Sequence, residues 1–364
     1  MPSTASAPRT VLVTGAAGYI GSHVARVLRQ RGETVVTLDD LSTGSAARLD
    51  GPLDLRLDLA GPGALESLEA FLSGRRVTDV VHLAAMKQVG ESVERPTHYM
   101  DRNVGGLVHL LTAMERCRVE QLVFSSSAAV YGPTSVPLVA EEHALAPANP
   151  YGQSKLIGEW MTENAARSWG LRAANLRYFN VAGTGWPDLA DDGVANLIPI
   201  VLRAAQQGDP VRVFGTDLPT PDGSCVRDFV HVLDLAHAHV AALDHVRTVP
   251  GARAFNIGTG TGTSVRSVVE AAEVVTGRRI EVVNGAPRAG DPAIVVADPT
   301  RAHRELGWSA QHAVADAVES AWRASTARHC SRPDDGGARD GPLGHPRTER
   351  AVLVHRSEPP VRAR

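Results

Sequence analysis

A strand-like run followed at once by three glycines is the feature that most restricts the fold of this chain. Residues 9–14 (RTVLVT) are apolar and β-branched, as in a buried strand, and residues 22–30 have helical spacing. The glycines at positions 15, 18 and 21 permit a tight turn and a close approach of the backbone to a ligand. The spacing is G-x-x-G-x-x-G rather than G-x-G-x-x-G, and the bulky residues between the glycines argue against a flexible loop. The pattern predicts a strand, a turn and a helix whose N-terminus holds a pyrophosphate.

Strand-like and helix-like segments then alternate. Further strands are expected at Thr34–Leu38, Leu53–Leu57, Asp79–Leu83, Leu122–Phe124 and Ala173–Phe179, with helical spacing between them. This alternation predicts an α/β fold with a doubly wound parallel sheet of the Rossmann type. Ligands bind beyond the carboxyl ends of such strands, and small or polar residues follow several of them: Asp39, Asp58, Ala84 and the serines at 125–127.

Asp39 lies 18 residues after Gly21, close to the position of the acid that binds the adenosine ribose in this fold. A carboxylate there accepts a hydrogen bond from the 2′-hydroxyl and repels a 2′-phosphate. The spacing therefore favours NAD over NADP. Asp40 either shares this role or is an ordinary turn residue.

The chain divides into four parts by composition and pattern. We expect a flexible N-terminus over residues 1–9, an NAD-binding Rossmann domain over 10–180, a mainly substrate-binding α/β domain over 181–325 and a disordered tail over 326–364. Candidate helices in the third part are Leu197–Gln207, Asp234–Asp244, Ser264–Thr276, Arg301–Leu306 and Ala313–Ala324, and candidate strands are Val211–Phe214, Ala254–Ile257 and Ile280–Val283.

Composition excludes several classes of function. The net charge of −3 gives no indication of binding to nucleic acid or to an anionic membrane, and no apolar run is long enough to span a bilayer. Three cysteines without close spacing indicate neither a disulfide framework nor a metal site. We therefore expect a cytoplasmic protein without metal.

Tyr151 and Lys155 form the candidate catalytic pair. In a helix they are i and i+4, so both side chains project from one face. A nearby ammonium favours the phenolate, so we expect the pKa of Tyr151 to be lowered enough for it to act as a base near neutrality. By contrast, His82 in the Asp79–Leu83 run is expected to be a packed strand residue.

Taken together, these motifs resemble the extended short-chain dehydrogenase/reductases. Longer strings narrow the resemblance to the UDP-glucose 4-epimerase family: VLVTGAAGYIGSHV, VGESVERP, FSSSAAVYG, YGQSKLIGE, LRYFNVAG and VRDFVHVLDLA. It extends from about Thr10 to about Trp322. The resemblance implies reversible C4 epimerisation of UDP-glucose and UDP-galactose through a 4-keto intermediate, with hydride transfer to and from bound NAD.

The resemblance also implies roles for individual residues. Tyr151 is the acid/base, Lys155 tunes it and binds the nicotinamide ribose, and Ser127 hydrogen-bonds the reacting oxygen. The residues that line NAD are Gly15, Gly18, Tyr19, Ile20, Gly21, Asp39, Asp40, Asp58, Leu59, Leu83, Ala84, Lys87, Asn103, Ser125, Tyr151, Lys155 and Phe179. Those that face the nucleotide sugar are Ser127, Asn180, Asn196, Leu197, Arg227, Arg288, Asp291 and Val295. Guanidinium groups at two of these positions suit a pyrophosphate. The family is usually homodimeric, here through the helices near His98–Arg116 and Tyr151–Trp169.

Three alternatives stay open. Related 4,6-dehydratases carry an acidic pair where this chain has Ala128 and Ala129, which argues against dehydration. Val295 stands where some members have a bulky Tyr, so UDP-N-acetylglucosamine could also be accepted, and a UDP-pentose is another possible substrate. A non-catalytic NAD-sensing protein on the same fold is the third, although such proteins typically lose the Tyr/Lys pair.

Overall fold

The computed structural model describes residues 9–134, 136–191, 193, 196–286 and 292–330. Its largest sheet has seven parallel strands in the order β11-β7-β5-β4-β1-β2-β3, so the predicted doubly wound sheet is confirmed. The strands are β1 (Thr10–Thr14), β2 (Thr34–Asp39), β3 (Leu55–Arg56), β4 (Asp79–His82), β5 (Gln121–Ser125), β7 (Arg172–Tyr178) and β11 (Ala252–Ile257). Strand order reverses beside β1, which has β2 on one side and β4 on the other. Open α/β sheets bind ligands at such a reversal.

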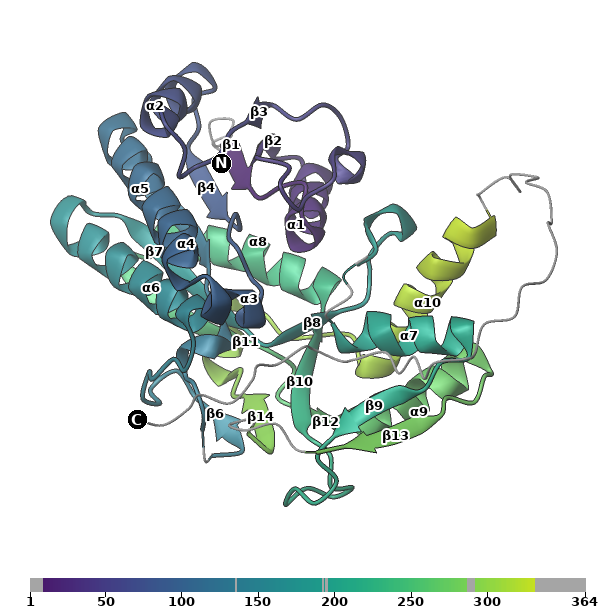
Figure 1. Ribbon diagram of the computed structural model, residues 1–364. Helices are drawn as coiled ribbons and strands as arrows, with labels where there is room; N and C mark the ends of the chain where they lie inside the picture. Colours follow the sequence, from purple (N-terminus) through teal and green to yellow (C-terminus); the bar gives the residue numbers. More distant parts are fainter. Residues whose placement is uncertain (1–8, 135, 192, 194–195, 287–291, 331–364) are drawn as a thin grey trace, which may run out of the picture.

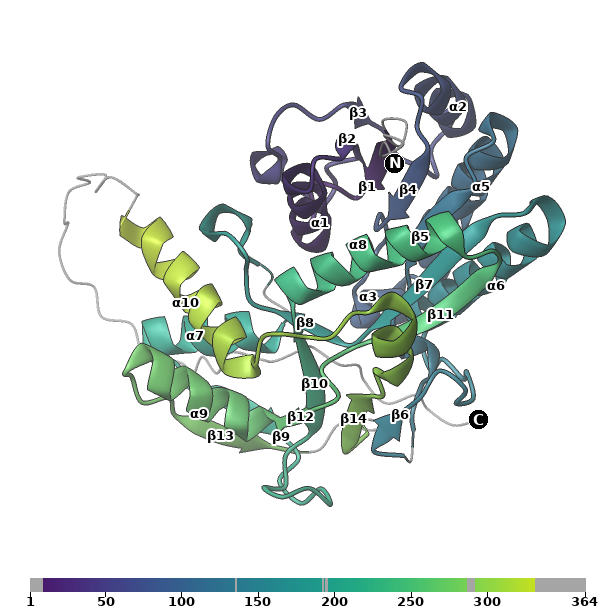
Figure 2. The same cartoon turned by 180° about the vertical axis from the view of Figure 1, so that it is seen from behind.

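Helices cover both faces of this sheet. Figures 1 and 2 show α1 (Tyr19–Gln30) and α8 (Val232–Thr248) on one face, and α2 (Ala64–Gly74), α5 (Gly106–Cys117) and α6 (Pro150–Trp169) on the other. Strand β1 illustrates why both faces are buried: Val11 and Val13 belong to the core under α1 and α8, whereas Leu12 belongs to the core under α2 and α5.

A longer helical stretch precedes β5. It consists of α4 (Pro96–Met100), a π-helical turn, η2 (Asp101–Gly105), and α5, and it follows the short α3 (Val89–Glu94). The π-helical turn carries both Arg102 and Asn103, and such turns often occur at functional sites.

Helix α6 has clear start and stop signals. The side chain of Asn149 accepts a hydrogen bond from the backbone N–H of Gly152 (2.9 Å), and Pro150 occupies the first turn. Gly170 ends the helix in the left-handed region. Tyr151 is thereby fixed in the first turn of α6.

A smaller part lies beyond the carboxyl ends of the large sheet (Figure 1). It contains the strands β6 (Leu138–Val139), β8 (Asn180–Ala182), β10 (Val226–His231), β12 (Gly262–Ser264) and β14 (Ile294–Ala297), and a separate pair of β9 (Val211–Phe214) and β13 (Val282–Gly285). Its helices are α7 (Leu197–Gln207), α9 (Val265–Thr276) and α10 (Val314–Cys330), which share a buried core. Short 3-10 turns lie at Ala46–Arg48 (η1), Ala128–Val130 (η3) and Pro187–Leu189 (η4), and a π-helical turn lies at Ala302–Leu306 (η5).

Two expectations about the second half need correction. The segment 181–325 does not serve the smaller part alone, because its β11 pairs with β7 at the edge of the large sheet and its α8 packs on β5 and β7. The tail does not begin at residue 326, because α10 continues to Cys330. The rest of the expected tail, and residues 1–8, lie outside the described residues.

Candidate active site

The turn between β1 and α1 is a close-fitting cradle. Gly15 has a φ of +68°, and a Cβ atom there would lie 2.7 Å from the backbone nitrogen of Ala84. A Cβ atom on Gly21 would lie 2.0 Å from the carbonyl oxygen of Gly15. Within the described part of the chain, no side chain caps the first N–H groups of α1, whose N-cap is Gly18. Free N–H groups at a helix start, with a backbone that can be approached closely, fit the pyrophosphate of NAD.

The bulky residues of this turn anchor it to the rest of the fold. The Tyr19 hydroxyl donates to the carbonyl oxygen of Gly183, and burial raises the pKa of this phenol well above its ordinary value. Ile20 packs against the core shared by α1 and α8. These contacts fix the glycine turn against β8 and α8.

Carboxylates from two strand ends form the next part of the site. Asp39 is buried at the end of β2 and accepts hydrogen bonds from the backbone N–H groups of Ala17 (2.9 Å) and Leu41 (2.8 Å), while burial raises its pKa. Asp40 follows it, and Asp58 follows β3 with the buried Leu59 beside it.

Asn103 connects the end of β4 to α6. Its side-chain oxygen accepts from the backbone N–H of Met86 (2.8 Å), and its amide donates to the Met86 carbonyl (3.0 Å) and to the Ser154 hydroxyl (2.9 Å). Leu83 and Ala84 lie between β4 and this contact, and the exposed Lys87 follows it. These residues therefore lie where the sequence places them, along the carboxyl edge of the sheet.

Three successive serines at the end of β5 each contact α6. The ammonium of Lys155 donates to the Ser125 carbonyl (2.8 Å), the Ser126 hydroxyl donates to Glu159, and a side-chain hydrogen bond joins Ser127 to Tyr151. The three partners on α6 are spaced by four residues, so they share one helix face. The predicted pair of Tyr151 and Lys155 is thus brought together with Ser127, and Tyr151 and Lys155 are both buried.

The charge state of this pair differs from the expectation. Burial raises the pKa of Tyr151, an effect that its hydrogen bond with Ser127 only partly opposes, and burial lowers the pKa of Lys155 to about 7. The prediction that Lys155 lowers the pKa of Tyr151 is therefore wrong for the chain by itself. Desolvation outweighs the ammonium, whose nitrogen lies 5.9 Å from the centre of the phenol ring.

The predicted substrate residues lie on β8, β10, β14 and the start of α7. Arg227 and Val295 are register partners of the parallel strands β10 and β14, and Val295 packs on the small core that contains Phe179. Asn180 begins β8, Asn196 is the N-cap of α7, and Leu197 is the first residue of that helix. Arg288 and Asp291 lie outside the described residues.

Comparisons with known proteins follow this geometry. Over residues 11–258 the sequence matches the NAD dependent epimerase/dehydratase family. The chain belongs to this family. It is 44% identical over 336 residues to a UDP-glucose 4-epimerase of Streptomyces lividans, a match that covers 90% of this chain and 98% of that protein. The resemblance to UDP-glucose 4-epimerases is therefore confirmed.

Solved structures agree with the sequence match. A UDP-glucose 4-epimerase from Stenotrophomonas maltophila, with bound NAD and formylated UDP-arabinopyranose, has a TM-score of 0.85 and 38% identity, covering 89% of this chain and 100% of that one. A UDP-Glc/GlcNAc 4-epimerase from Campylobacter jejuni has a TM-score of 0.77 and 32% identity, covering 88% of this chain and 99% of that one. NAD is accordingly the cofactor of this epimerase/dehydratase family member, in agreement with its glycine cradle.

The family includes epimerases and dehydratases, and the residues after Ser127 distinguish the two reactions here. Ala128 and Ala129 form the 3-10 turn η3 directly after Ser127. Neither side chain carries an acid or a base that could eliminate water. The site of this family member is therefore equipped for proton transfer at one oxygen rather than for dehydration.

A buried ion pair beneath the serines escaped the sequence analysis. Arg177 on β7 donates to both carboxylate oxygens of Glu159, with a closest contact of 2.6 Å, and both side chains are almost fully buried. Glu159 ends the motif YGQSKLIGE and stands one turn after Lys155, on the same helix face as Tyr151. That spacing was a usable indication of its position, but nothing local identified Arg177 as its partner.

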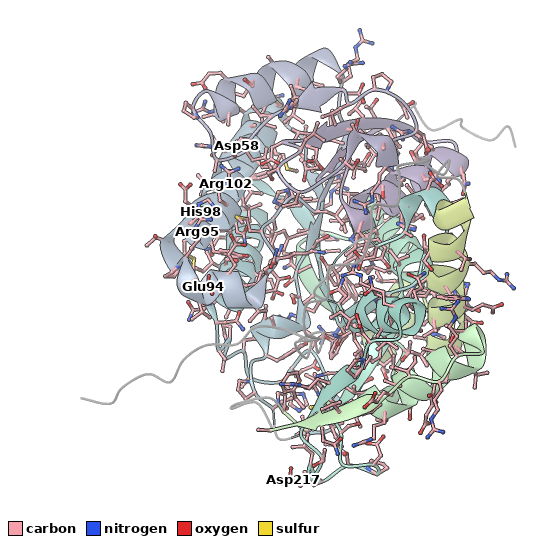
Figure 3. All side chains as sticks on the ribbon, turned by 45° about the vertical axis from the view of Figure 1, so that its right-hand side comes forward. Asp58, Glu94, Arg95, His98, Arg102 and Asp217 are labelled. Carbon is pink, nitrogen blue, oxygen red and sulfur yellow. The ribbon has the colours of Figure 1, made fainter. Side chains whose placement is uncertain are left out.

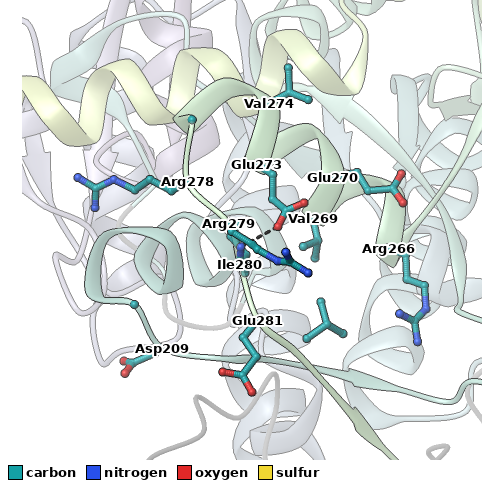
Figure 4. A pocket seen from close by; sticks show the side chains of 13 residues that line it. Asp209, Arg266, Val269, Glu270, Glu273, Val274, Arg278, Arg279, Ile280 and Glu281 are labelled. Carbon is teal, nitrogen blue, oxygen red and sulfur yellow. Dashed lines mark hydrogen bonds between the residues drawn. The ribbon is translucent and has the colours of Figure 1, made fainter.

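The remaining surface shows no competing site. The groove in Figure 4 lies between α9 and β13 on the outer side of the smaller part, and it combines acidic and basic side chains such as Glu270, Glu273 and Arg266. None of the predicted cofactor or substrate residues lines it. Among the described residues, no group of three or more His, Cys, Asp or Glu side chains could hold a metal ion, and no helix could cross a membrane.

Proposed function

We propose that the chain interconverts UDP-glucose and UDP-galactose at C4, with Tyr151 as the acid/base. The observation that carries this proposal is the meeting of Ser127, Tyr151 and Lys155 at the carboxyl end of β5, on the same sheet edge as the glycine cradle. A non-catalytic NAD sensor has no need for this trio.

In the proposed reaction, Tyr151 as phenolate takes the proton from the sugar 4-hydroxyl and returns it when the 4-keto sugar is reduced. Bound NAD supplies the hydride acceptor and a positive charge beside the phenol, which lowers the pKa that burial raises. Ser127 orients the 4-oxygen, and Lys155 binds the nicotinamide ribose. The 4-keto sugar turns over while its UDP stays held, so hydride returns to the opposite face and C4 is inverted.

The ligands are proposed to lie along the carboxyl edge of the large sheet. The glycine turn would hold the pyrophosphate of NAD, Asp39 the adenosine ribose, and Asn103 the strand end beside the nicotinamide. Arg227, Asn180 and the start of α7 would hold the nucleotide sugar, since a guanidinium binds phosphate oxygens well.

Product formation from UDP-galactose without added NAD tests this function. We expect UDP-glucose from the wild-type protein, because a cofactor that is regenerated in each cycle stays bound. Tyr151→Phe should lower kcat by at least about 10³-fold, because it removes the only oxygen of the proposed base. Substantial turnover by Tyr151→Phe would contradict the assignment.

A second substrate is favoured by one observation. Val295 lies beside Arg227 on the proposed sugar side, where a small side chain leaves room for an N-acetyl group at C2. The similarity to the UDP-Glc/GlcNAc 4-epimerase of Campylobacter jejuni supports the same idea. We expect Val295→Tyr to slow epimerisation of UDP-N-acetylgalactosamine more than that of UDP-galactose. Equal effects on both substrates, or no reaction of the acetylated sugar with the wild type, would exclude this idea.

We further propose a homodimer formed through α5 and α6. Val108 on α5 and Trp160 on α6 are 44% and 52% exposed, although both are large and apolar. Sedimentation equilibrium should give a dimer for the wild type and a monomer for Trp160→Lys. A wild-type monomer at micromolar concentration would contradict the proposal.

A cytoplasmic location is proposed from cysteine usage. Among the described residues, Cys117 and Cys225 form no disulfide, which suits a reducing compartment. Cell fractionation with an antibody against the chain tests this location.

A further inference from the structure

Arg102 joins two carboxylates that come from different strand ends. One of its terminal nitrogens contacts the Asp58 carboxylate, and the other donates to Asp40 at 3.0 Å. Figure 3 shows Asp58 and Arg102 next to one another on the outer side of the molecule. Arg102 belongs to the π-helical turn η2, so a residue of the helical layer holds together the ends of β2 and β3.

Each of the two carboxylates is also held by its own turn. Asp40 accepts hydrogen bonds from the backbone N–H (2.8 Å) and the hydroxyl of Ser42, and Asp58 accepts from the backbone N–H of Ala60 (3.0 Å). Only the bridge through Arg102 fixes one turn relative to the other. Its planar guanidinium can bond two carboxylates at once, which a lysine ammonium does with less directional control.

The charges at this end of the site make such a bridge necessary. Asp39, Asp40 and Asp58 gather where β2 and β3 end, and NAD carries a negatively charged pyrophosphate. Without a cation, these carboxylates would repel one another and the cofactor. Arg102 offsets that charge and leaves Asp39, which it does not contact, with its own backbone partners.

The neighbouring residue serves the opposite end of the same site. Asn103 reaches Met86 and Ser154, toward Tyr151 and Lys155, whereas Arg102 reaches the two acids. A single π-helical turn therefore directs two consecutive side chains to the two ends of the proposed NAD position.

We propose that Arg102 is a positioning residue for NAD, which sets the Asp40 and Asp58 turns at the adenosine end and offsets their charge. This inference rests on the proposed position of the adenosine beyond β2 and β3. It concerns cofactor affinity and not the chemical step, so it can fail while the proposed function stands.

The test is NAD affinity measured by titration calorimetry on protein stripped of cofactor. Arg102→Gln should weaken NAD binding about tenfold, and Arg102→Lys, which keeps the charge, should restore part of the loss. ADP-ribose should lose affinity by the same factor as NAD, because the effect lies at the adenosine end. With saturating NAD, kcat should stay within about twofold of the wild type.

Arg116→Gln is the matched control. Arg116 lies further along the same helical stretch and forms an exposed ion pair with Glu69 (2.7 Å), so its loss should leave NAD affinity unchanged. NAD affinity of Arg102→Gln within twofold of this control would overturn the inference. Loss of affinity for NAD without loss for ADP-ribose would also overturn it, because the defect would then lie elsewhere. Wild-type turnover of UDP-galactose, measured in the same preparation, tests the proposed function separately.

Discussion

Glu159→Gln is the change that tests most directly how the active site is held. The Glu159 carboxylate accepts from two nitrogens of Arg177 and from the Ser126 hydroxyl, and it is 1% exposed. Arg177 also donates to the Tyr131 hydroxyl (3.0 Å) and to the carbonyl oxygen of Glu141 (3.1 Å). The substitution keeps the shape of the side chain but leaves the buried guanidinium without a counter-charge.

The expected loss of stability follows from that burial. Removing one partner of a buried ion pair costs roughly 3–5 kcal/mol, and we expect the lower end because the amide still accepts one hydrogen bond. Each kcal/mol shifts Tm by roughly 2–4 °C in a large domain, so Tm should fall by roughly 6–12 °C. Ser126 would lose its acceptor, and the displacement of the adjacent Ser127 should lower kcat by roughly tenfold to a hundredfold with little change in KM.

Differential scanning calorimetry and steady-state kinetics below the lower Tm provide the measurements. Glu69→Gln is the matched control, because it breaks the exposed pair with Arg116 and should cost no more than about 1 kcal/mol. If Glu159→Gln melted within about 2 °C of the wild type, the buried pair would not hold the site as argued. The double variant Glu159→Leu with Arg177→Met should regain stability but not activity, since apolar replacement removes the burial penalty and still leaves Ser126 without its acceptor.

Three further changes test the electrostatics and the surface. Lys155→Met should raise Tm below pH 7, because burial lowers the pKa of this lysine to about 7 and folding then opposes its charge; between about pH 7 and its unfolded pKa near 10.4 the wild-type lysine deprotonates on folding and the difference should vanish, and a difference that grew with pH would refute this sign. Asp39→Asn should narrow the preference for NAD over NADP by about tenfold in calorimetric titrations, because the repelling carboxylate is gone; an unchanged ratio would place the ribose elsewhere. Trp160→Lys should leave Tm of the isolated chain within about 1 °C while it abolishes dimerisation, since the indole is half exposed; a large drop would mean that it packs within the chain.

Local signals explain what the sequence predicted well. Helix α7 and strand β9 have the bounds that hydrophobic spacing indicates, Leu197–Gln207 and Val211–Phe214. His82 is buried and stacked on Phe124, and burial lowers its pKa to about 3, so it is the neutral strand residue that was expected. These features depend on neighbours within a few residues, and the sequence contains that information directly.

Non-local pairing explains what the sequence did not predict. The partner of β11 is β7, which lies far away in the chain, so a strand taken as part of the smaller domain completes the large sheet instead. Strand β10 belongs to a motif that was recognised, VRDFVHVLDLA, yet its extended conformation was not predicted from it. Arg102 and Arg177 look like ordinary arginines until the fold brings acids to them.

The error about Tyr151 has a different origin and says more about the mechanism. Spacing of i and i+4 correctly brought an ammonium near the phenol, but it could not account for the desolvation of both groups, which favours a neutral tyrosine and a weakly basic lysine. Within this chain, the Ser127 hydrogen bond is the contact that lowers the pKa of the phenol. The further positive charge that a phenolate needs must then come from the ligand side of the site. It follows that the base should form only when cofactor is bound, and that a protein stripped of NAD should neither ionise Tyr151 near neutrality nor exchange the protons of a bound sugar.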